Sequence, residues 1–475
     1  MDRQAVLARA ARWFDEGHYQ ALMARRVAMP TPSDGGQSPE SLRVYLDEEI
    51  VPSLGALGFA CQVIDNPVAG GPPMLIARRI EDPALPTLMT YGHGDTIGGQ
   101  EPLWREGLQP WKLVVEGERW FGRGTADNKG QHTAMLAALE QVILAREGRL
   151  GYNVVVLLEM GEELGSPGLR EVCREQAAQL RADLFIASDG PRVRAADPTV
   201  FLGSRGIINF SLQLRARARA FHSGNWGGAL LNPGTVIAAA VASLVDGRGR
   251  IRVRGLMPPP IDPAVRAALA DVRIGGDVDD PELAEDWGEP GLSAAERLMA
   301  WNTLEVLALG CGNAARPVNA IPGEAIAHCQ LRFVPGTDWE NLQGIVEAHL
   351  RAEGFDAVQV RVIAATPATR LDLRNPWVPW ALDSIRATTG KEPTLVPNLA
   401  GSLPNDCFAE ILGLPTIWVP HSYPACAQHA PNEHLLAGVA REGVLLATGL
   451  FWDLGEPGRA PWPASGAATR ASATH

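Results

Sequence analysis

Three short apolar runs, each followed by polar residues, constrain the fold of this chain more than any other feature. The runs cover residues 87–91, 153–160 and 182–188, and their lengths suit buried parallel strands, as does the valine and isoleucine content of the last two. An alanine- and leucine-rich stretch at 128–146 predicts a helix between the first two runs. Strands that alternate with helices indicate an α/β sheet. Open sheets of this kind bind ligands outside the carboxyl ends of their strands, so the polar residues there are expected to share one crevice.

Histidines and carboxylates without thiolates gather at these strand ends and in two further segments. The candidate residues are His93, Asp95, Asp127, Glu162, Glu163, Asp189 and His429. Such ligands suit zinc, manganese or cobalt in an open hydrolytic site. Five ligands and one spare glutamate would serve two metals and a general base. Two simpler interpretations exist for single residues: Asp127 as a plain helix cap, and the two adjacent glutamates as a solvated acidic pair.

The pattern of the chain changes after residue 205. Residues 210–217 and 325–334 alternate apolar and polar positions, as half-exposed antiparallel strands do, and a helix is predicted at 233–246. We therefore predict a catalytic α/β domain with a mostly parallel sheet, formed by residues 1–205 and 372–475. A smaller α+β domain, residues 206–371, is inserted into it. The first domain resumes with a helix at 377–389 and a strand at 416–420, and this segment must return His429 to the crevice.

Composition and charge argue against several classes of protein. The 475 residues are 46% hydrophobic and 20% charged, which is typical of a soluble chain with more than one domain. A formal net charge of -12 argues against nucleic acid and anionic membranes as partners. No stretch has the length and apolarity of a membrane span, and no secretory signal is evident at the N-terminus. The six cysteines are scattered and form no Cys-x-x-Cys pair, so we expect reduced thiols and a cytoplasmic location.

Several motifs follow one another along nearly the whole chain. They are Gly-His-Gly-Asp-Thr at 92–96, Gly-Arg-Gly-Thr-Ala-Asp-Asn-Lys-Gly at 122–130, Glu-Glu-Leu-Gly-Ser at 162–166, His-Ser-Gly-Asn-Trp-Gly-Gly at 222–228, Asn-Ala-Ile-Pro at 319–322, Gly-Ser-Leu-Pro at 401–404 and His-Ala-Pro-Asn-Glu at 429–433. In these motifs the chain resembles the dinuclear zinc aminoacylase/carboxypeptidase family of metallopeptidases, and within it the cytosolic, carnosine dipeptidase-like branch.

The resemblance implies two divalent metal ions per subunit. It assigns His93 and Asp189 to one ion, Glu163 and His429 to the other, and Asp127 to a bridge between them, beside a cis peptide bond to the next residue. Zinc is the expected metal, although manganese and cobalt accept the same ligands.

The resemblance also implies roles for residues that bind no metal. Asp95 orients a metal-binding imidazole, and Glu162 is the general base. His222 reaches into the active site of the partner subunit in dimeric relatives, so we expect a homodimer in which the inserted domain serves as lid and dimerisation domain. The substrate-binding residues are Asn319, Arg332 and Ser402.

These roles predict hydrolysis of a peptide or amide bond in a small substrate, most simply a dipeptide or aminoacyl amide. Glu162 would take a proton from a water shared by the two metals and pass it to the leaving amine. His222 would help to stabilise the oxyanion, and Arg332 would clamp a substrate carboxylate. The segment 397–402 lacks the charged residues that precede this loop in the dipeptidases, and Trp226 is a further candidate specificity element. An N-acyl amino acid deacylase or amidase, a carboxypeptidase and a non-catalytic binding protein therefore remain alternatives.

Overall fold

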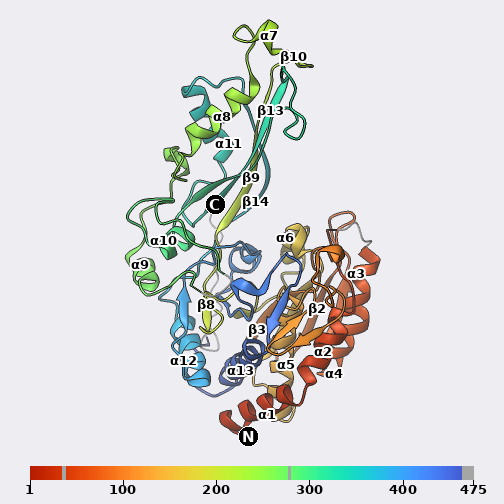
Figure 1. Ribbon diagram of the computed structural model, residues 1–475. Coiled ribbons are helices and arrows are strands. Elements are labelled where there is room, and N and C mark those ends of the chain that lie inside the picture. The colour runs from red at the N-terminus through yellow and green to blue at the C-terminus, as the bar shows by residue number, and fades with distance from the viewer. Residues whose placement is uncertain (35–38, 277–279, 463–475) are drawn as a thin grey trace.

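The computed structural model describes residues 1–34, 39–276 and 280–462. It has two parts, seen one above the other in Figure 1. The lower part is built on a large sheet covered by helices, and the upper part is an elongated layer of long strands and helices.

The lower part contains a mixed sheet of eight strands. These are β1 (Ala60–Ile64), β2 (Met74–Arg79), β3 (Thr87–His93), β6 (Asn153–Glu159), β7 (Leu184–Ala187), β8 (Thr199–Phe201), β15 (Thr394–Val396) and β16 (Thr416–Trp418). Their order is β1-β2-β6-β3-β7-β16-β8-β15. The central strands β6, β3, β7 and β16 are parallel. The α/β class is confirmed, while β1, β2 and the β8–β16 pair add antiparallel contacts toward the two edges.

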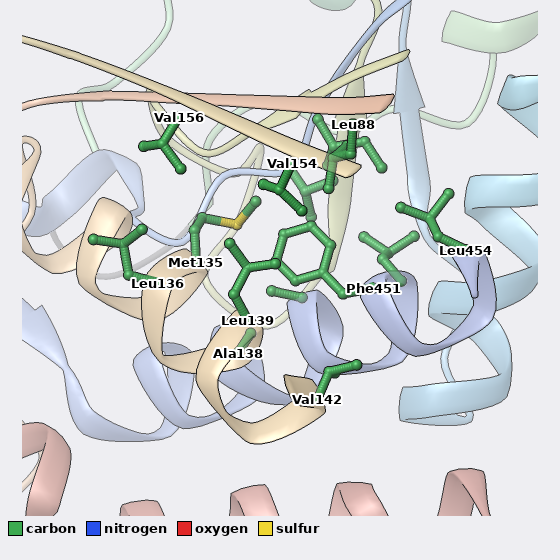
Figure 2. Close-up of a cluster of buried hydrophobic side chains, with 14 of the residues drawn as sticks. Leu88, Met135, Leu136, Ala138, Leu139, Val142, Val154, Val156, Phe451 and Leu454 are labelled. Atoms are coloured by element: carbon green, nitrogen blue, oxygen red, sulfur yellow. The ribbon is translucent and has the colours of Figure 1, made fainter. Parts of the chain in front are cut away.

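Both faces of this sheet are buried, which explains why its strands are apolar runs without alternation. In β6, Val154, Val156 and Leu158 enter one core, whereas Val155 and Leu157 enter another. The first face is covered by α3 (Pro39–Tyr45), the π-helical turn η1 (Leu46–Ile50), α4 (Val51–Ala56), α5 (Lys129–Ala145), α12 (Trp377–Thr389) and α13 (Ala437–Leu454). Figure 2 shows part of this core, where Leu139 of α5 and Phe451 of α13 meet the strand residues. Outside it, α1 (Arg3–Asp15) and α2 (His18–Val27) pack on α5 and α13.

The second face is covered by helices from distant parts of the chain. They are α6 (Leu169–Glu175), α9 (Pro263–Leu269), α10 (Ala294–Met299) and the π-helical turn η5 (Cys407–Ile411). Val265 of α9 and Met299 of α10 contribute to this core. The stretch that follows α8 (Pro233–Leu244) therefore returns to the large sheet before the chain enters the upper part again.

The upper part is an antiparallel sheet in the order β11-β13-β9-β14. Its strands are β9 (Gly206–Arg215), β11 (Thr303–Gly310), β13 (Glu324–Phe333) and β14 (Gln359–Thr366). Helices α8 and α11 (Leu342–Ala352) pack on it around a separate core. At its far tip lie β10 (Phe221–His222), β12 (Ala320–Ile321) and α7 (Ser223–Trp226), as Figure 1 shows for β10 and α7.

A small sheet connects the C-terminal segment to the start of α5. It contains β4 (Val114–Glu116), β5 (Arg119–Phe121) and β17 (His434–Leu436) in the order β17-β5-β4. The short turns η2 (Glu101–Leu103), η3 (Glu162–Leu164), η4 (Arg254–Leu256) and η6 (Pro424–Cys426) complete the elements. No helix in the part of the chain described here is long and apolar enough to cross a membrane.

Candidate metal centre

Three buried side chains meet outside the carboxyl ends of β3 and β7. They are His93, the last residue of β3, Asp127, which precedes α5, and Asp189, which follows β7. One ligand atom from each lies within 4.8 Å of the others. The His93 Nε2 atom is 3.0 Å from Asp127 Oδ1 and 3.7 Å from Asp189 Oδ2. This group combines one nitrogen and two carboxylate oxygens, a ligand set that suits a divalent cation.

A second group of ligand atoms shares Asp127 with the first. Its other members are Glu163 and His429, and again one atom from each lies within 4.8 Å of the others. The His429 Nε2 atom is 3.0 Å from Asp127 Oδ2 and 2.9 Å from Glu163 Oε2. The two oxygens of Asp127 thus face two different imidazoles, which is the geometry that a bridging carboxylate requires. The peptide bond between Asp127 and Asn128 is cis, as the family resemblance implied.

The two sides of the centre differ in their access to solvent. His93, Asp127 and Asp189 are buried, whereas the His429 side chain is 54% exposed. Its backbone lies in the left-handed region, with a φ of 60°, which turns the imidazole back toward Asp127. The second group is therefore the open side from which a small substrate can approach.

Charge crowding at the centre shows that the residues fit cations. Burial and the charge of Asp127 raise the pKa of Glu163 to about 7. Burial raises the pKa of Asp189 to about 6, with a further contribution from Asp127. Burial and the surrounding carboxylates also raise the pKa of Glu162 well above its usual value. Carboxylates held this close repel one another, and divalent cations would relieve that repulsion.

An orphaned oxygen supports the same conclusion. The Asp189 Oδ2 atom is buried and has no hydrogen-bond partner in the described structure, while its Oδ1 atom accepts from the Gly190 amide at 2.6 Å. A buried polar atom without a partner is costly, so an oxygen aimed at His93 Nε2 in this way suits a metal ligand.

Asp95 connects the two ends of the centre. Its buried carboxylate lies 3.3 Å from His93 Nδ1 and accepts from the Ser33 hydroxyl at 2.8 Å. It also accepts from the backbone amides of Glu162 and Glu163, at 3.2 and 3.1 Å. Sequence reasoning predicted only the contact with the imidazole. The contacts with the two amides show that Asp95 also fixes the turn η3, which carries both glutamates.

Glu433 is a positioning residue that sequence reasoning missed. Its buried carboxylate accepts from the amides of Ala126 and Asp127, at 2.9 and 3.1 Å, through Oε1. Its Oε2 atom accepts from the Gly124 amide at 3.1 Å and the Arg123 guanidinium at 2.8 Å. One side chain thus ties the loop of Asp127, the residue common to both candidate groups, to the segment of His429. Its place within the motif at 429–433 was the only signal in the sequence.

Replacing Glu433 with glutamine should weaken metal binding by roughly 10–100-fold, the range found for residues that support metal ligands. The Glu433 carboxylate accepts four hydrogen bonds through its two oxygens, whereas a glutamine side chain has only one oxygen that can accept. The loop of Asp127 therefore loses part of its support. Competition with a calibrated chelator measures the change. The surface variant Glu48→Gln is the control, and equal metal affinity in both variants would contradict the positioning role.

The candidate substrate-binding residues and His222 fall into two places, whereas Glu162 lies in η3 at the centre itself. The Arg332 guanidinium donates to the Ser402 hydroxyl at 3.0 Å, so these two residues, far apart in sequence, lie together. His222 and Asn319 lie together at the tip of the upper part, where the Ser223 amide donates to the Asn319 carbonyl at 2.9 Å. Figure 1 shows this tip well separated from β3 and α5 of the same chain.

His421 follows β16 in the chain and belongs to neither group of candidate ligands. It is buried, and burial lowers its pKa to about 3, so it is neutral. His132 and His434 are also buried, and each ring nitrogen Nε2 pairs with a tyrosine hydroxyl, at 2.9 and 2.6 Å. These contacts favour structural roles for His132 and His434.

Comparisons with known proteins bear on the family of the chain and on its fold. The model of a family described as Peptidase family M20/M25/M40 matches residues 89–452. The chain is 25% identical over 415 residues to the Beta-Ala-His dipeptidase of Homo sapiens, covering 81% of this chain and 78% of that protein. It is 24% identical over 411 residues to the Cys-Gly metallodipeptidase DUG1 of Saccharomyces cerevisiae, covering 80% and 81%. The crystal structure of the M20 family metallo-carboxypeptidase Sso-CP2 from Sulfolobus solfataricus superposes with a TM-score of 0.79 at 23% identity, covering 92% of this chain and 99% of that one.

Proposed function

The chain belongs to peptidase family M20/M25/M40, and on that premise we propose that it is a metal-dependent dipeptidase that acts at the centre described above. The observation that carries the proposal is the pair of ligand groups joined by Asp127. Relatives that match most of the chain are dipeptidases by name, one acting on Beta-Ala-His and another on Cys-Gly. An N-acyl amino acid deacylase or a carboxypeptidase with the same centre is the second candidate, since a structural neighbour is a metallo-carboxypeptidase.

Two divalent ions would be held at this centre. His93 and Asp189 are proposed to bind one, Glu163 and His429 the other, and Asp127 both. When bound, the ions polarise the substrate carbonyl and make water acidic enough to attack it near neutral pH. Zinc is the proposed metal, and metal analysis of the purified protein distinguishes it from manganese and cobalt.

The remaining residues are proposed to handle the proton and the substrate. Glu162 takes the proton of the attacking water and gives it to the leaving amine. Arg332 binds the carboxylate of the substrate, a role supported by its contact with Ser402 and by its planar, five-donor guanidinium. Asn319 and Ser402 supply further polar contacts, and Asp95 orients His93.

We further propose a division of labour between parts of the chain. Residues 1–205 and 372–475 form the catalytic domain, and residues 206–371 form a lid and dimerisation domain. A cytoplasmic location is proposed from the six free cysteines, none of which forms a disulfide.

A substrate panel tests the proposed activity. The metal-loaded protein is incubated with dipeptides and N-acyl amino acids, and the released amine is detected by mass spectrometry with and without chelator. Release from dipeptides that chelator abolishes is the expected result. Release from N-acyl amino acids alone would assign the protein to the deacylases, and metal-independent release would contradict the proposed mechanism.

The second subunit is proposed to complete each active site. His222 is exposed and lies on β10 at the tip of the upper part, away from the metal ligands of its own chain. From the partner subunit it would reach the site and stabilise the oxyanion.

Mixing two inactive variants tests this exchange. Glu162→Gln and His222→Ala should each be inactive as homodimers. In a mixed dimer one site has its own Glu162 and the His222 of the Glu162→Gln subunit. Random reassembly should therefore restore about a quarter of wild-type activity, because half the dimers are mixed and each has one intact site. No recovery in mixtures that contain mixed dimers, or a fully active monomer in light scattering, would contradict the proposal.

A further inference from the structure

Two arginines, Arg205 and Arg332, lie side by side at the junction of the upper and lower parts. Arg205 is 5% exposed, and its Nε atom donates to the Ala400 carbonyl at 2.8 Å. Arg332 is half-buried on β13. Among the residues that the structure describes, no carboxylate oxygen lies within 4.0 Å of either guanidinium. Buried charges are ordinarily paired, so this pair is suited to bind an anion.

The loop that contains Ser402 joins the two arginines. The Ser402 hydroxyl accepts from Arg332 Nη1 at 3.0 Å and donates to the backbone carbonyl of Arg205 at 2.6 Å. Arg332 is also the strand partner of Thr303, whose hydroxyl is 3.5 Å from Arg205 Nη1. Burial and the nearby charge of Arg332 lower the pKa of Arg205 to about 9. An incoming carboxylate would relieve the repulsion between the two cations.

A cavity of about 360 Å³ adjoins both arginines. This volume lies within the range of roughly 300–1,000 Å³ that is typical of small-molecule sites. Its walls are largely apolar and are formed by Ile251, Leu283, Trp287, Leu298 and Trp301. Trp287 is 49% exposed and Leu283 is 44% exposed, so large apolar side chains face the solvent-accessible space of the cavity.

The other charged residues that line the cavity balance one another. Glu289 and Glu305 carry negative charge, and Arg250 and Arg297 carry positive charge. Arg250 has a partner in Asp246, and Arg297 donates to the carbonyls of neighbouring residues. The arginine pair therefore gives the cavity lining its excess of positive charge, beside the apolar residues named above.

We propose that this cavity binds the C-terminal amino acid of the substrate, with its α-carboxylate on Arg205 and Arg332 and a large apolar or aromatic side chain against Trp287 and Trp301. An amino acid of this kind matches both features of the cavity, because its carboxylate pairs with the two arginines and its side chain packs on the apolar wall. Glu289 and Glu305 disfavour an acidic side chain there. The inference rests on the proposed function, because it places the leaving amino acid of the hydrolysed bond. Arg205 and Trp287 are then specificity-determining residues.

Hydrolysis of a dipeptide series tests the apolar wall. The value of kcat/KM should be roughly tenfold or more higher for Ala-Phe and Ala-Leu than for Ala-Gly, since buried apolar contacts discriminate by about this factor. Trp287→Ala should remove most of this preference by lowering kcat/KM for Ala-Phe and Ala-Leu. The matched control is Leu144→Ala, an exposed residue at the far end of α5, which should keep the preference. Equal rates on all three peptides in the wild type would overturn the inference.

Product binding tests the cavity without turnover. Calorimetry with the metal-loaded protein compares L-phenylalanine, glycine and L-phenylalaninol, which lacks the carboxylate. Phenylalanine should bind roughly tenfold or more tightly than either, because each of the others loses one of the two contacts. Arg205→Gln should remove the advantage over phenylalaninol, and Trp287→Ala the advantage over glycine.

The two tests separate failure of the inference from failure of the proposed function. A protein that hydrolyses no peptide but binds phenylalanine in this pattern would overturn the dipeptidase activity and support the cavity. A protein that hydrolyses peptides but binds the three compounds equally would overturn the cavity alone.

Discussion

Replacing Glu162 with glutamine should lower kcat by roughly 10²–10⁴-fold, the contribution of a positioned general base, while both metals stay bound. Glutamine has nearly the same shape and can accept a hydrogen bond, but its amide cannot take a proton from water. The backbone amide that Asp95 fixes at this position is unchanged by the substitution, so the turn η3 and the neighbouring proposed ligand Glu163 should keep their places.

Steady-state kinetics and metal analysis of the same sample test this prediction, because together they separate loss of the base from loss of metal. Glu48→Gln makes the identical chemical change on an exposed residue and should have wild-type activity. A variant that loses metal along with activity would make Glu162 a ligand, and a variant with nearly full activity would exclude it as the base.

Replacing Asp127 with asparagine should have the other large effect. The variant should bind either no metal or a single metal ion with low affinity. Each of its oxygens faces a different imidazole, at 3.0 Å in both cases, and only one oxygen remains in asparagine. Metal activation supplies several kcal/mol of transition-state stabilisation, so activity should fall by roughly 10³-fold or more.

Metal content after dialysis against metal-free buffer measures the effect directly. The matched change Asp65→Asn, at a side chain that is 94% exposed, should leave two metals per chain. If Asp127→Asn also kept two tightly bound metals, the bridging role would be wrong.

Much of the lower part could be predicted because its central strands are recognisable from their local sequence pattern. Continuous apolar runs located β3, β6 and β7, and the rule for strand carboxyl ends placed His93 beside Asp189. The helix predicted at 377–389 has the same bounds in the structure. Local pattern sufficed for these elements, because burial on both faces requires apolar residues at successive positions.

Other features depend on contacts between distant segments, which no local pattern encodes. The hydrogen bonds of Glu433 with the loop before α5 join residues about 300 positions apart. The sequence around Glu433 contains no pattern that predicts them. The packing of α9 and α10 on the large sheet was missed for the same reason. Their segment is rich in proline, glycine and aspartate. The role of its few apolar residues becomes clear only from the surface of the large sheet that they cover.

The order of the ligands along the chain has a consequence for biosynthesis. His93, Asp127, Glu163 and Asp189 are made early, but His429 comes after the whole upper part. The small sheet that positions its segment also needs β17, which is made still later. Before residue 429 is made, a growing chain can therefore contain the proposed ligands of the first ion but not those of the second. Hydrolytic capacity should therefore arise only after the strands and helices of the upper part have been made.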